Sequence, residues 1–264
     1  MIPTRPGTAV GDGSLREHAR VGIIDDLAAE DDRLERILES LDESQWRSPS
    51  LAPGWSIADV ILHLAQSDEA AVASLTAGPA DGTDWRSDGD TVDGAMEARV
   101  REERSEPAAV FARWKAARRA AIEALRSADP DVRFRWAAAP LRPATLATTR
   151  IAEHWAHGLD VTEPLGIDFP DTDRLRHVAW LGHSTLPYAF GLAGLEPQPV
   201  RCDLTGPNGD VWTFGPADAP SAIVGAAGEF CRVGARRLAP TDSSLEATGP
   251  FGATALRLLR NYAA

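Results

Sequence analysis

Apolar residues that recur every three or four positions are the feature that most constrains the fold of this 264-residue chain. The first such series comprises Ile23, Leu27, Leu34, Ile37, Leu38 and Leu41, with acidic residues between them. This spacing gathers the apolar side chains on one face of an α-helix. A helix of this kind buries its apolar face against another element, so the series predicts one helix of a helical bundle.

Similar series follow, separated by turn signals. Ser56 and Asp59 form a variant of the capping box that opens helices, and the helix that they begin is expected to end near Gly78. Further helices are expected over residues 93–128 (split at Pro107), 144–159 and 172–194 (interrupted at Pro187). The two interruptions are predicted because proline lacks the backbone donor that a helix interior requires.

The pattern changes after about Pro197. Residues 200–204 alternate like a strand, residues 206–209 mark a turn, and residues 211–214 are typical of the returning strand. Two short helices are expected near residues 226–237 and 251–261. The predicted fold class is therefore mainly α, a four-helix bundle with a small C-terminal α+β unit. The expected boundaries are a loose segment at 1–20, the bundle at 21–196 and the α+β unit at 197–264.

Composition narrows the function classes. A formal net charge of −12 without a clustered basic run argues against nucleic-acid binding. The chain shows no secretory h-region and no apolar run long enough for a membrane span, so we expect a cytoplasmic protein.

Cys202 and Cys231 lack metal-site spacing and are expected to be buried thiols. Phosphate-binding loops, dinucleotide fingerprints and nucleophile motifs are missing from the sequence.

His63 lies in the middle of the second expected helix, between Leu62 and Leu64. At about 100° per residue, its helical face also carries Val60, Ser67, Ala70 and Ser74. The side chain is therefore expected to point toward small residues at the flank of the packed face. A hydrogen-bonded core histidine and a metal ligand are both compatible with this position.

Glu153 and His157 are four residues apart and share one helical face, which Arg150 and Asp160 extend in both directions. A solvated stripe of ion pairs is one explanation of this row. With His63, however, Glu153 and His157 make a set of two imidazoles and one carboxylate, which suits zinc or a related ion with an open coordination position. Bundles build such sites from facing helices, so both explanations stay open at this point.

Two segments carry a resemblance to a known family: LAPGWSIADVILHLAQSDEA at residues 51–70 and TRIAEHWAHGLDVTEPLG at residues 149–166. They resemble the actinobacterial DinB-like superfamily, which includes mycothiol-dependent maleylpyruvate isomerases. The later segments DRLRHVAWLGHSTLPYAFGL and VRCDLTGPNGDVWTFGP resemble a branch labelled metal-binding or wyosine base formation domain. The resemblance implies a DinB-like four-helix bundle whose metal ligands are His63, Glu153 and His157.

The resemblance also implies a function. We expect a metal-dependent enzyme, a transferase or isomerase that uses mycothiol or a similar thiol on a small electrophilic metabolite. Zinc is the first expectation for the metal, with nickel, iron and manganese as alternatives. Two other interpretations stay open: a metal-dependent hydrolase, lyase or cyclase that uses no thiol, and a non-catalytic module that binds a metal or a ligand. The expected partner is a small molecule, and the sequence does not predict the oligomeric state.

Residues near the three ligands are given supporting roles. Arg150 is expected to hold Glu153 or to bind a substrate carboxylate, and Asp160 to orient an imidazole or to cap the end of the helix. Trp55, Trp155 and His183 are candidates for the lining of a cofactor pocket. His154 is not expected to be a ligand, because adjacent residues on a helix point about 100° apart.

Overall fold

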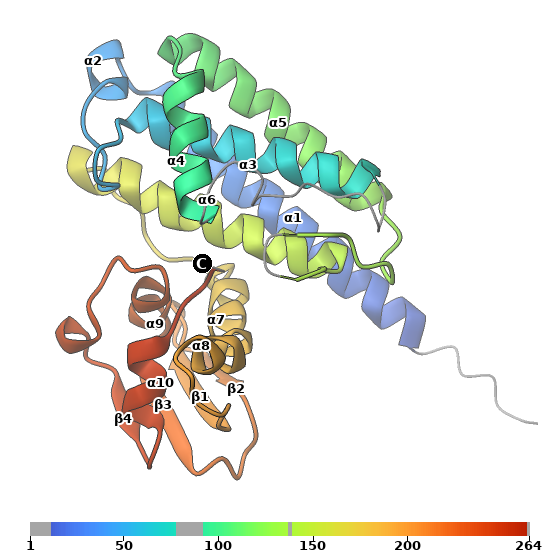
Figure 1. The fold of residues 1–264 in the computed structure, drawn as a ribbon, viewed down its shortest axis with the longest axis vertical. Coiled ribbons are helices and arrows are strands. Elements are labelled where there is room, and N and C mark those ends of the chain that lie inside the picture. Colours follow the sequence, from blue (N-terminus) through green and yellow to red (C-terminus); the bar gives the residue numbers. More distant parts are fainter. Residues whose placement is uncertain (1–11, 78–91, 137–138, 263–264) are drawn as a thin grey trace, which may run out of the picture.

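The structure, a computed structural model, describes residues 12–77, 92–136 and 139–262. Figure 1 shows a bundle of long helices above a smaller α+β unit. The long helices are α1 (Asp12–Glu39), α3 (Ile57–Ala77), α5 (Pro107–Ser127) and α6 (Pro143–Leu165), and two shorter ones are α2 (Glu43–Trp46) and α4 (Val92–Glu103). The predicted fold class, mainly α with a helical bundle and a small C-terminal α+β unit, is confirmed.

The predicted start and stop signals act as expected. Ser56 and Asp59 form the capping box of α3, with Ser56 N donating to Asp59 Oδ2 at 2.9 Å and Asp59 N to Ser56 Oγ at 3.2 Å. Pro107 separates α4 from α5 and occupies the first turn of α5, where its missing donor costs nothing. α6 differs, because it continues past the expected end at residue 159 to Leu165, where Gly166 ends it in the left-handed region at φ 64°.

The start of α1 differs from the expected boundary. We expected a loose segment over residues 1–20, but α1 begins at Asp12. The glycines, prolines and threonines behind that expectation lie mostly within residues 1–11, and residues 14–20 contain neither proline nor glycine. Residues 1–11 fall outside the described part of the chain.

A mixed four-stranded sheet forms the base of the C-terminal unit among the described residues, with β1 (Val200–Thr205), β2 (Val211–Phe214), β3 (Ser221–Ala226) and β4 (Glu246–Thr248) in the order β2-β1-β3-β4. The predicted hairpin of β1 and β2 is present, with Cys202 opposite Phe214. β3 runs parallel to β1, and β4 pairs antiparallel with β3. No pattern in the sequence predicted β3 or β4.

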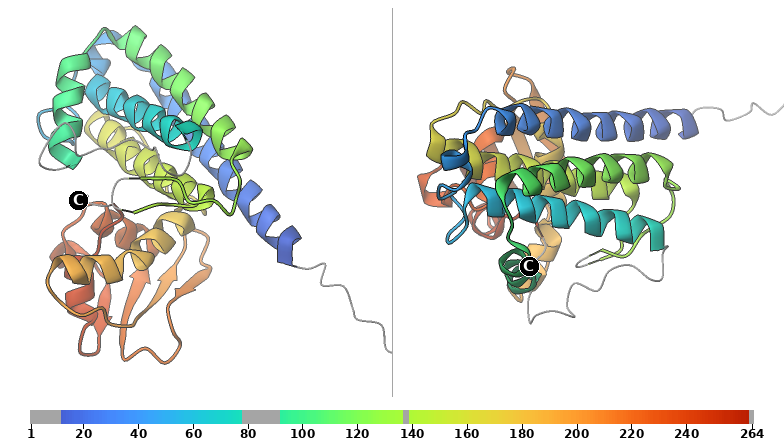
Figure 2. Two further views of the ribbon diagram at one scale, coloured as in Figure 1. Left: turned by 45° about the vertical axis from the view of Figure 1, so that its right-hand side comes forward. Right: turned by 90° about the horizontal axis from the view of Figure 1, so that it is seen from above.

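The helices of this unit are α7 (Leu175–Ser184), α8 (Leu186–Leu192), α9 (Ala227–Gly234) and α10 (Gly252–Leu258). Both α7 and α8 lie with the sheet, below the bundle, in Figures 1 and 2. The expected boundary at 196/197 placed these two helices with the bundle, and it stays a prediction.

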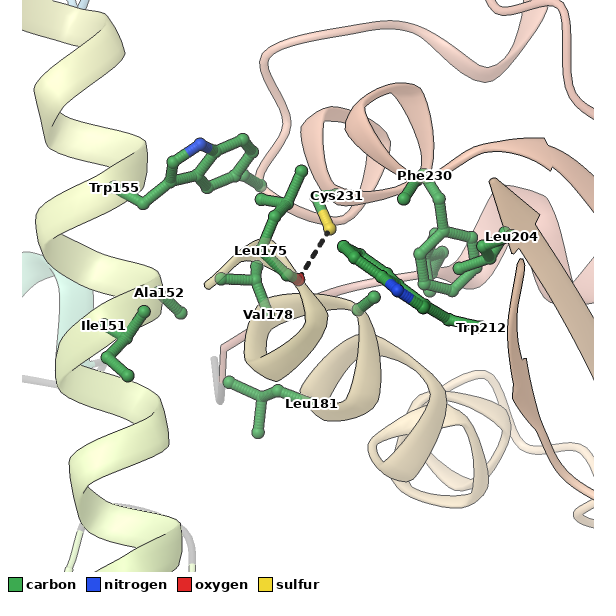
Figure 3. Close-up of a cluster of buried hydrophobic side chains, with 14 of the residues drawn as sticks. Ile151, Ala152, Trp155, Leu175, Val178, Leu181, Leu204, Trp212, Phe230 and Cys231 are labelled. Carbon is green, nitrogen blue, oxygen red and sulfur yellow. Dashed lines mark hydrogen bonds between the residues drawn. The ribbon is translucent and has the colours of Figure 1, made fainter. Parts of the chain in front are cut away.

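One apolar cluster joins the bundle to the C-terminal unit. Figure 3 shows Ile151, Ala152 and Trp155 on α6 pointing toward Leu175 and Val178 of α7. The cluster continues to residues of the sheet and of α9, all buried: Leu204, Trp212, Phe230 and Cys231. Because burial of apolar surface is the main stabilising term in folding, this shared core holds the unit against α6.

The two cysteines are buried and free, as predicted. Burial raises the pKa of the Cys202 thiol to about 12. Cys231 is also held in its protonated form by burial, and its Sγ lies 3.8 Å from the Leu175 carbonyl oxygen. Neither thiol has the lowered pKa of a nucleophile. No helix in the described ranges combines the length and apolar character that a bilayer span requires.

Candidate metal centre

The three predicted ligands meet in the bundle, where α3 faces α6. One carboxylate oxygen of Glu153, Oε2, lies 3.5 Å from His63 Nε2 and 3.5 Å from His157 Nε2. The two imidazole centroids are 4.9 Å apart, and the rings are nearly perpendicular. One ligand atom from each residue lies within 4.8 Å of the other two, and within the described residues no other group of histidine, cysteine or acidic side chains meets this condition.

The centre is enclosed on most sides. The side chains of His63 and His157 each expose 12% of their surface, and that of Glu153 exposes 26%. Trp55 covers part of His63, with 5.2 Å between the two ring centroids. Glu153 is therefore the most accessible of the three candidate ligands.

Asp160 fixes the orientation of His157. His157 Nδ1 donates to Asp160 Oδ2 at 2.8 Å, so Nε2 points at Glu153. The Asp160 side chain is fully buried, and Arg237 of the C-terminal unit donates to both its oxygens, from Nε at 2.6 Å and Nη2 at 2.5 Å. A carboxylate behind the distal nitrogen is the usual support of a metal-binding histidine. The predicted role of Asp160 agrees with this geometry.

The protonation states suit a cation. Burial would raise the pKa of Glu153, but hydrogen bonds to His157 and His63 outweigh it and hold that pKa well below its usual value. Burial lowers the pKa of His63 and keeps this imidazole neutral. Burial also opposes the charged form of His157, yet Asp160 and Glu153 raise its pKa overall. An incoming cation would thus meet a Glu153 whose shifted pKa favours the ionised carboxylate and a His63 whose shifted pKa favours the neutral imidazole.

The chemistry of the donor set also fits a metal. His63 Nε2 faces Glu153, while its Nδ1 is enclosed and has no hydrogen-bond partner among the described residues, unlike Nδ1 of His157. Two imidazoles and one carboxylate with an open fourth position form a donor set that zinc and related ions accept.

The other predicted site residues are placed differently. Arg150 is buried, and its Nη1 donates to Ser67 Oγ at 2.6 Å. Within the described residues, no hydrogen bond or ion pair joins Arg150 to Glu153. Trp155 extends from α6 toward α7 and α9, within the shared core (Figure 3). His183 lies in the C-terminal unit, where Nε2 is 3.0 Å from the Val200 carbonyl oxygen. The structure therefore brings Trp55 to the centre but not Trp155 or His183.

His154, which was not expected to be a ligand, belongs to a second buried cluster. Its Nδ1 lies 2.9 Å from the Arg150 carbonyl oxygen, and its Nε2 lies 3.5 Å from Asp31 and 3.4 Å from Asp68. Burial opposes the charged imidazole, but the two carboxylates outweigh it and raise the pKa of His154 to about 9. A protonated Nε2 cannot also accept from Trp114 Nε1, 3.2 Å away. The two buried carboxylates favour the protonated form.

The sequence pattern did not predict that Arg237 supports the centre. It follows α9 and reaches Asp160 across 77 positions of the chain, so no local spacing connects the two. The residue before it, Arg236, adopts a positive φ of 62°, which is uncommon for a residue with a side chain. This backbone turn at the end of α9 directs the chain back toward α6.

A family model described as the mycothiol maleylpyruvate isomerase N-terminal domain matches residues 27–162 of this chain. These residues include all three candidate ligands and Asp160. The chain belongs to this family. An uncharacterized protein of Mycobacterium tuberculosis, found in strains H37Rv and CDC 1551, is 36% identical over 236 residues. That match covers 85% of this chain and 88% of the relative.

Solved structures of the same family share the fold. A crystal structure of a single-site mutant of mycothiol-dependent maleylpyruvate isomerase aligns with a TM-score of 0.58 at 15% identity, covering 83% of this chain and 90% of that one. A second crystal structure of this isomerase gives 0.56 at 15% identity, covering 87% and 92%. The alignment thus extends over the bundle and much of the C-terminal unit.

Proposed function

We propose that this family member is a metal-dependent enzyme that uses a thiol of the mycothiol type to transfer or isomerise a small electrophilic metabolite. The observation that carries the proposal is the contact of Glu153 Oε2 with the Nε2 atoms of His63 and His157, at 3.5 Å each. Membership in a family described by mycothiol maleylpyruvate isomerase supports the thiol and the type of reaction.

Three residues would bind the metal, and others orient or shield these ligands. His63, Glu153 and His157 would hold the cation, zinc first and nickel, iron or manganese as alternatives. With three protein ligands, such a cation lowers the pKa of a thiol or water at its open position. Asp160 keeps the Nδ1 proton of His157 in place, and Arg237 balances the buried charge of Asp160. Trp55 shields one side of His63 from water.

Metal and thiol dependence test the proposal together. The purified protein is assayed with mycothiol and a panel of electrophiles that includes maleylpyruvate, before and after removal of the metal by a chelator. We expect turnover that rises with thiol concentration, disappears in the metal-free protein and returns when the metal is restored. Metal-free protein, checked for residual ion, that turns over at the original rate would refute the proposal.

The same assay separates the other interpretations. Metal-dependent turnover without any thiol would favour a hydrolase, lyase or cyclase. Tight metal binding with no turnover of any compound would favour a binding module. The Glu153→Gln variant adds a readout independent of turnover, because it removes one negative charge at nearly constant shape and should weaken metal binding.

A further inference from the structure

The metal centre depends on how α3 and α6 are placed against each other. Glu153 and His157 belong to α6, whereas His63 belongs to α3, its neighbour in the bundle (Figures 1 and 2). The separation of Glu153 and His157 follows from their spacing on one helix. The position of His63 relative to them depends on contacts between the two helices. A binding site of this kind has to be held to within about 0.5 Å of its working geometry.

One helical turn from the centre, a second layer of polar side chains joins the same two helices. Ser67 follows His63 by four residues on α3, and Arg150 precedes Glu153 by three residues on α6. Arg150 Nη1 donates to Ser67 Oγ at 2.6 Å. Residue numbers rise along α3 as they fall along α6, so the helices run antiparallel. This layer therefore lies next to the metal centre along the contact between the two helices.

Asp68 is the carboxylate of this layer. Its Oδ1 lies 3.9 Å from Arg150 Nη1, and its Oδ2 lies 3.4 Å from His154 Nε2. Arg150 and His154 are four residues apart on α6, on either side of Glu153 in the sequence. One side chain of α3 therefore contacts two side chains of α6 that flank a candidate ligand.

The contacts of this layer are buried. The side chains of Asp68, Arg150 and His154 expose 2%, 4% and 1% of their surface. Apart from the metal centre and this layer, no side-chain hydrogen bond or ion pair joins α3 to α6 within the described residues. Apolar packing has no preferred direction, whereas buried polar contacts are stronger than in water and hold particular atoms together. This layer is therefore what specifies the register of the two helices.

Asp31 offers a comparison within the same cluster. Its Oδ1 lies 3.5 Å from His154 Nε2, and its side chain is as buried as that of Asp68. Asp31 is on α1, however, and α1 carries none of the three candidate ligands. The two carboxylates make similar contacts with one imidazole, but only Asp68 connects the two helices that carry the ligands.

We propose that Asp68 is a positioning residue of the metal centre. By holding Arg150 and His154 from α3, it sets the placement of the two helices at which the three candidate ligands converge. The inference rests on the proposed function only in taking these ligands to bind a cation. No hydrogen bond or ion pair joins Asp68 to any of the three within the described residues, so its role is placement and not coordination.

Metal affinity tests the proposal without any need for turnover. Zinc is titrated into the metal-free full chain in competition with a chromophoric chelator, for the wild type, Asp68→Asn and Asp31→Asn. Both substitutions change a buried carboxylate beside His154, so both should lower the urea midpoint of unfolding of the metal-free protein. We expect Asp68→Asn to bind zinc at least about tenfold more weakly than the wild type. Asp31→Asn should keep the wild-type affinity.

A spectroscopic measurement separates placement from stability. The visible absorption of bound cobalt(II) depends on the geometry of its ligands, and it is recorded under conditions in which every variant is folded. Cobalt-loaded Asp68→Asn should show an altered spectrum, because His63 no longer meets the two ligands of α6 at the same distance. Asp31→Asn should give the spectrum of the wild type.

A milder pair of variants decides the matter if Asp68→Asn does not fold. Ser67→Ala removes the acceptor of the Arg150 hydrogen bond. Ser74→Ala removes another buried hydroxyl of α3, which donates to the Arg135 carbonyl oxygen instead of contacting α6. We expect Ser67→Ala to weaken zinc binding by roughly a few-fold and Ser74→Ala to leave it unchanged.

The proposal is overturned if Asp68→Asn keeps the zinc affinity of the wild type, or if Asp68→Asn and Asp31→Asn lose equal affinity. Equal affinities in Ser67→Ala and Ser74→Ala would have the same meaning. The proposed function fails on a different result. Weak zinc binding by Asp68→Asn, together with a wild type that shows no thiol-dependent turnover, would refute the proposed function and leave this inference standing. A wild type that binds no zinc would refute both.

Discussion

Asp160 lies three residues after His157 on α6 and accepts a hydrogen bond from its Nδ1 at 2.8 Å. The Asp160 side chain has no solvent exposure, so its negative charge is balanced by His157 and Arg237 instead of water. Hydrogen bonds from these two residues outweigh burial and lower the pKa of Asp160. The orientation of a candidate ligand in the bundle therefore depends on a cation from the C-terminal unit.

Asp160→Asn should weaken metal binding about 10- to 100-fold, since it removes the charge that supports His157 and leaves Arg237 unbalanced. Competition with a chromophoric chelator measures the affinity. Asp203→Asn is the matched control, because Asp203 is paired with Arg201 on β1, outside the centre. Equal metal affinities for Asp160→Asn and the wild type would show that Asp160 does not support the ligand.

His63→Ala and His157→Ala should each lose most of the bound metal while the helical circular dichroism signal is retained. The wild type should carry about one equivalent per chain, because one ligand set of this kind is present among the described residues. Elemental analysis gives the metal content. His177→Ala, which removes a histidine that contacts Asp26 at 2.8 Å on α1, should keep the full equivalent. Full occupancy in both ligand variants would refute the assignment.

His154 should be protonated at neutral pH and titrate with a pKa of about 9. Because this pKa is raised above the usual value of 6.5, the stabilising contribution of His154 is complete below pH 6.5 and is lost as the pH rises through about 9. Imidazole nitrogen chemical shifts follow the titration, and His154→Asn identifies the resonance. A neutral His154 imidazole at neutral pH would contradict the proposed charge balance with Asp31 and Asp68.

A chain that ends at Leu195 should be poorly soluble. This cut retains α7 and α8 but removes the sheet and α9, so buried side chains such as Val178 and Phe190 lose their cover. Size-exclusion chromatography and metal analysis of the soluble fraction measure the effect. A monomeric, metal-binding fragment obtained in good yield would show that the C-terminal unit is an independent appendage.

Local signals in the sequence accounted for most of the bundle. These signals act between residues that are one or two helical turns apart, so the sequence alone contains them. They are the capping residues Ser56 and Asp59, the split at Pro107 and the apolar spacing. The spacing also placed Glu153 and His157 on one face. The link from these two residues to His63 came from the donor set and a family resemblance, because spacing along one helix cannot identify its neighbour.

The missed features depend on contacts between distant segments. β3 follows no strict alternation, and it pairs in parallel with β1 only after a connection through β2. β4 is three residues long. Trp155 was a candidate for the lining of a pocket, yet its position on α6 places its side chain in the shared core.

The contact between Arg237 and Asp160 also has a consequence for how relatives diverge. The family model ends at residue 162, so it includes the carboxylate but not the guanidinium that balances it. Loss of either partner leaves the other buried and uncompensated, which is more costly than losing both. Among relatives we therefore expect these two positions to change together, and a chimaera that joins a bundle to a foreign C-terminal unit to bind metal well only when it inherits both.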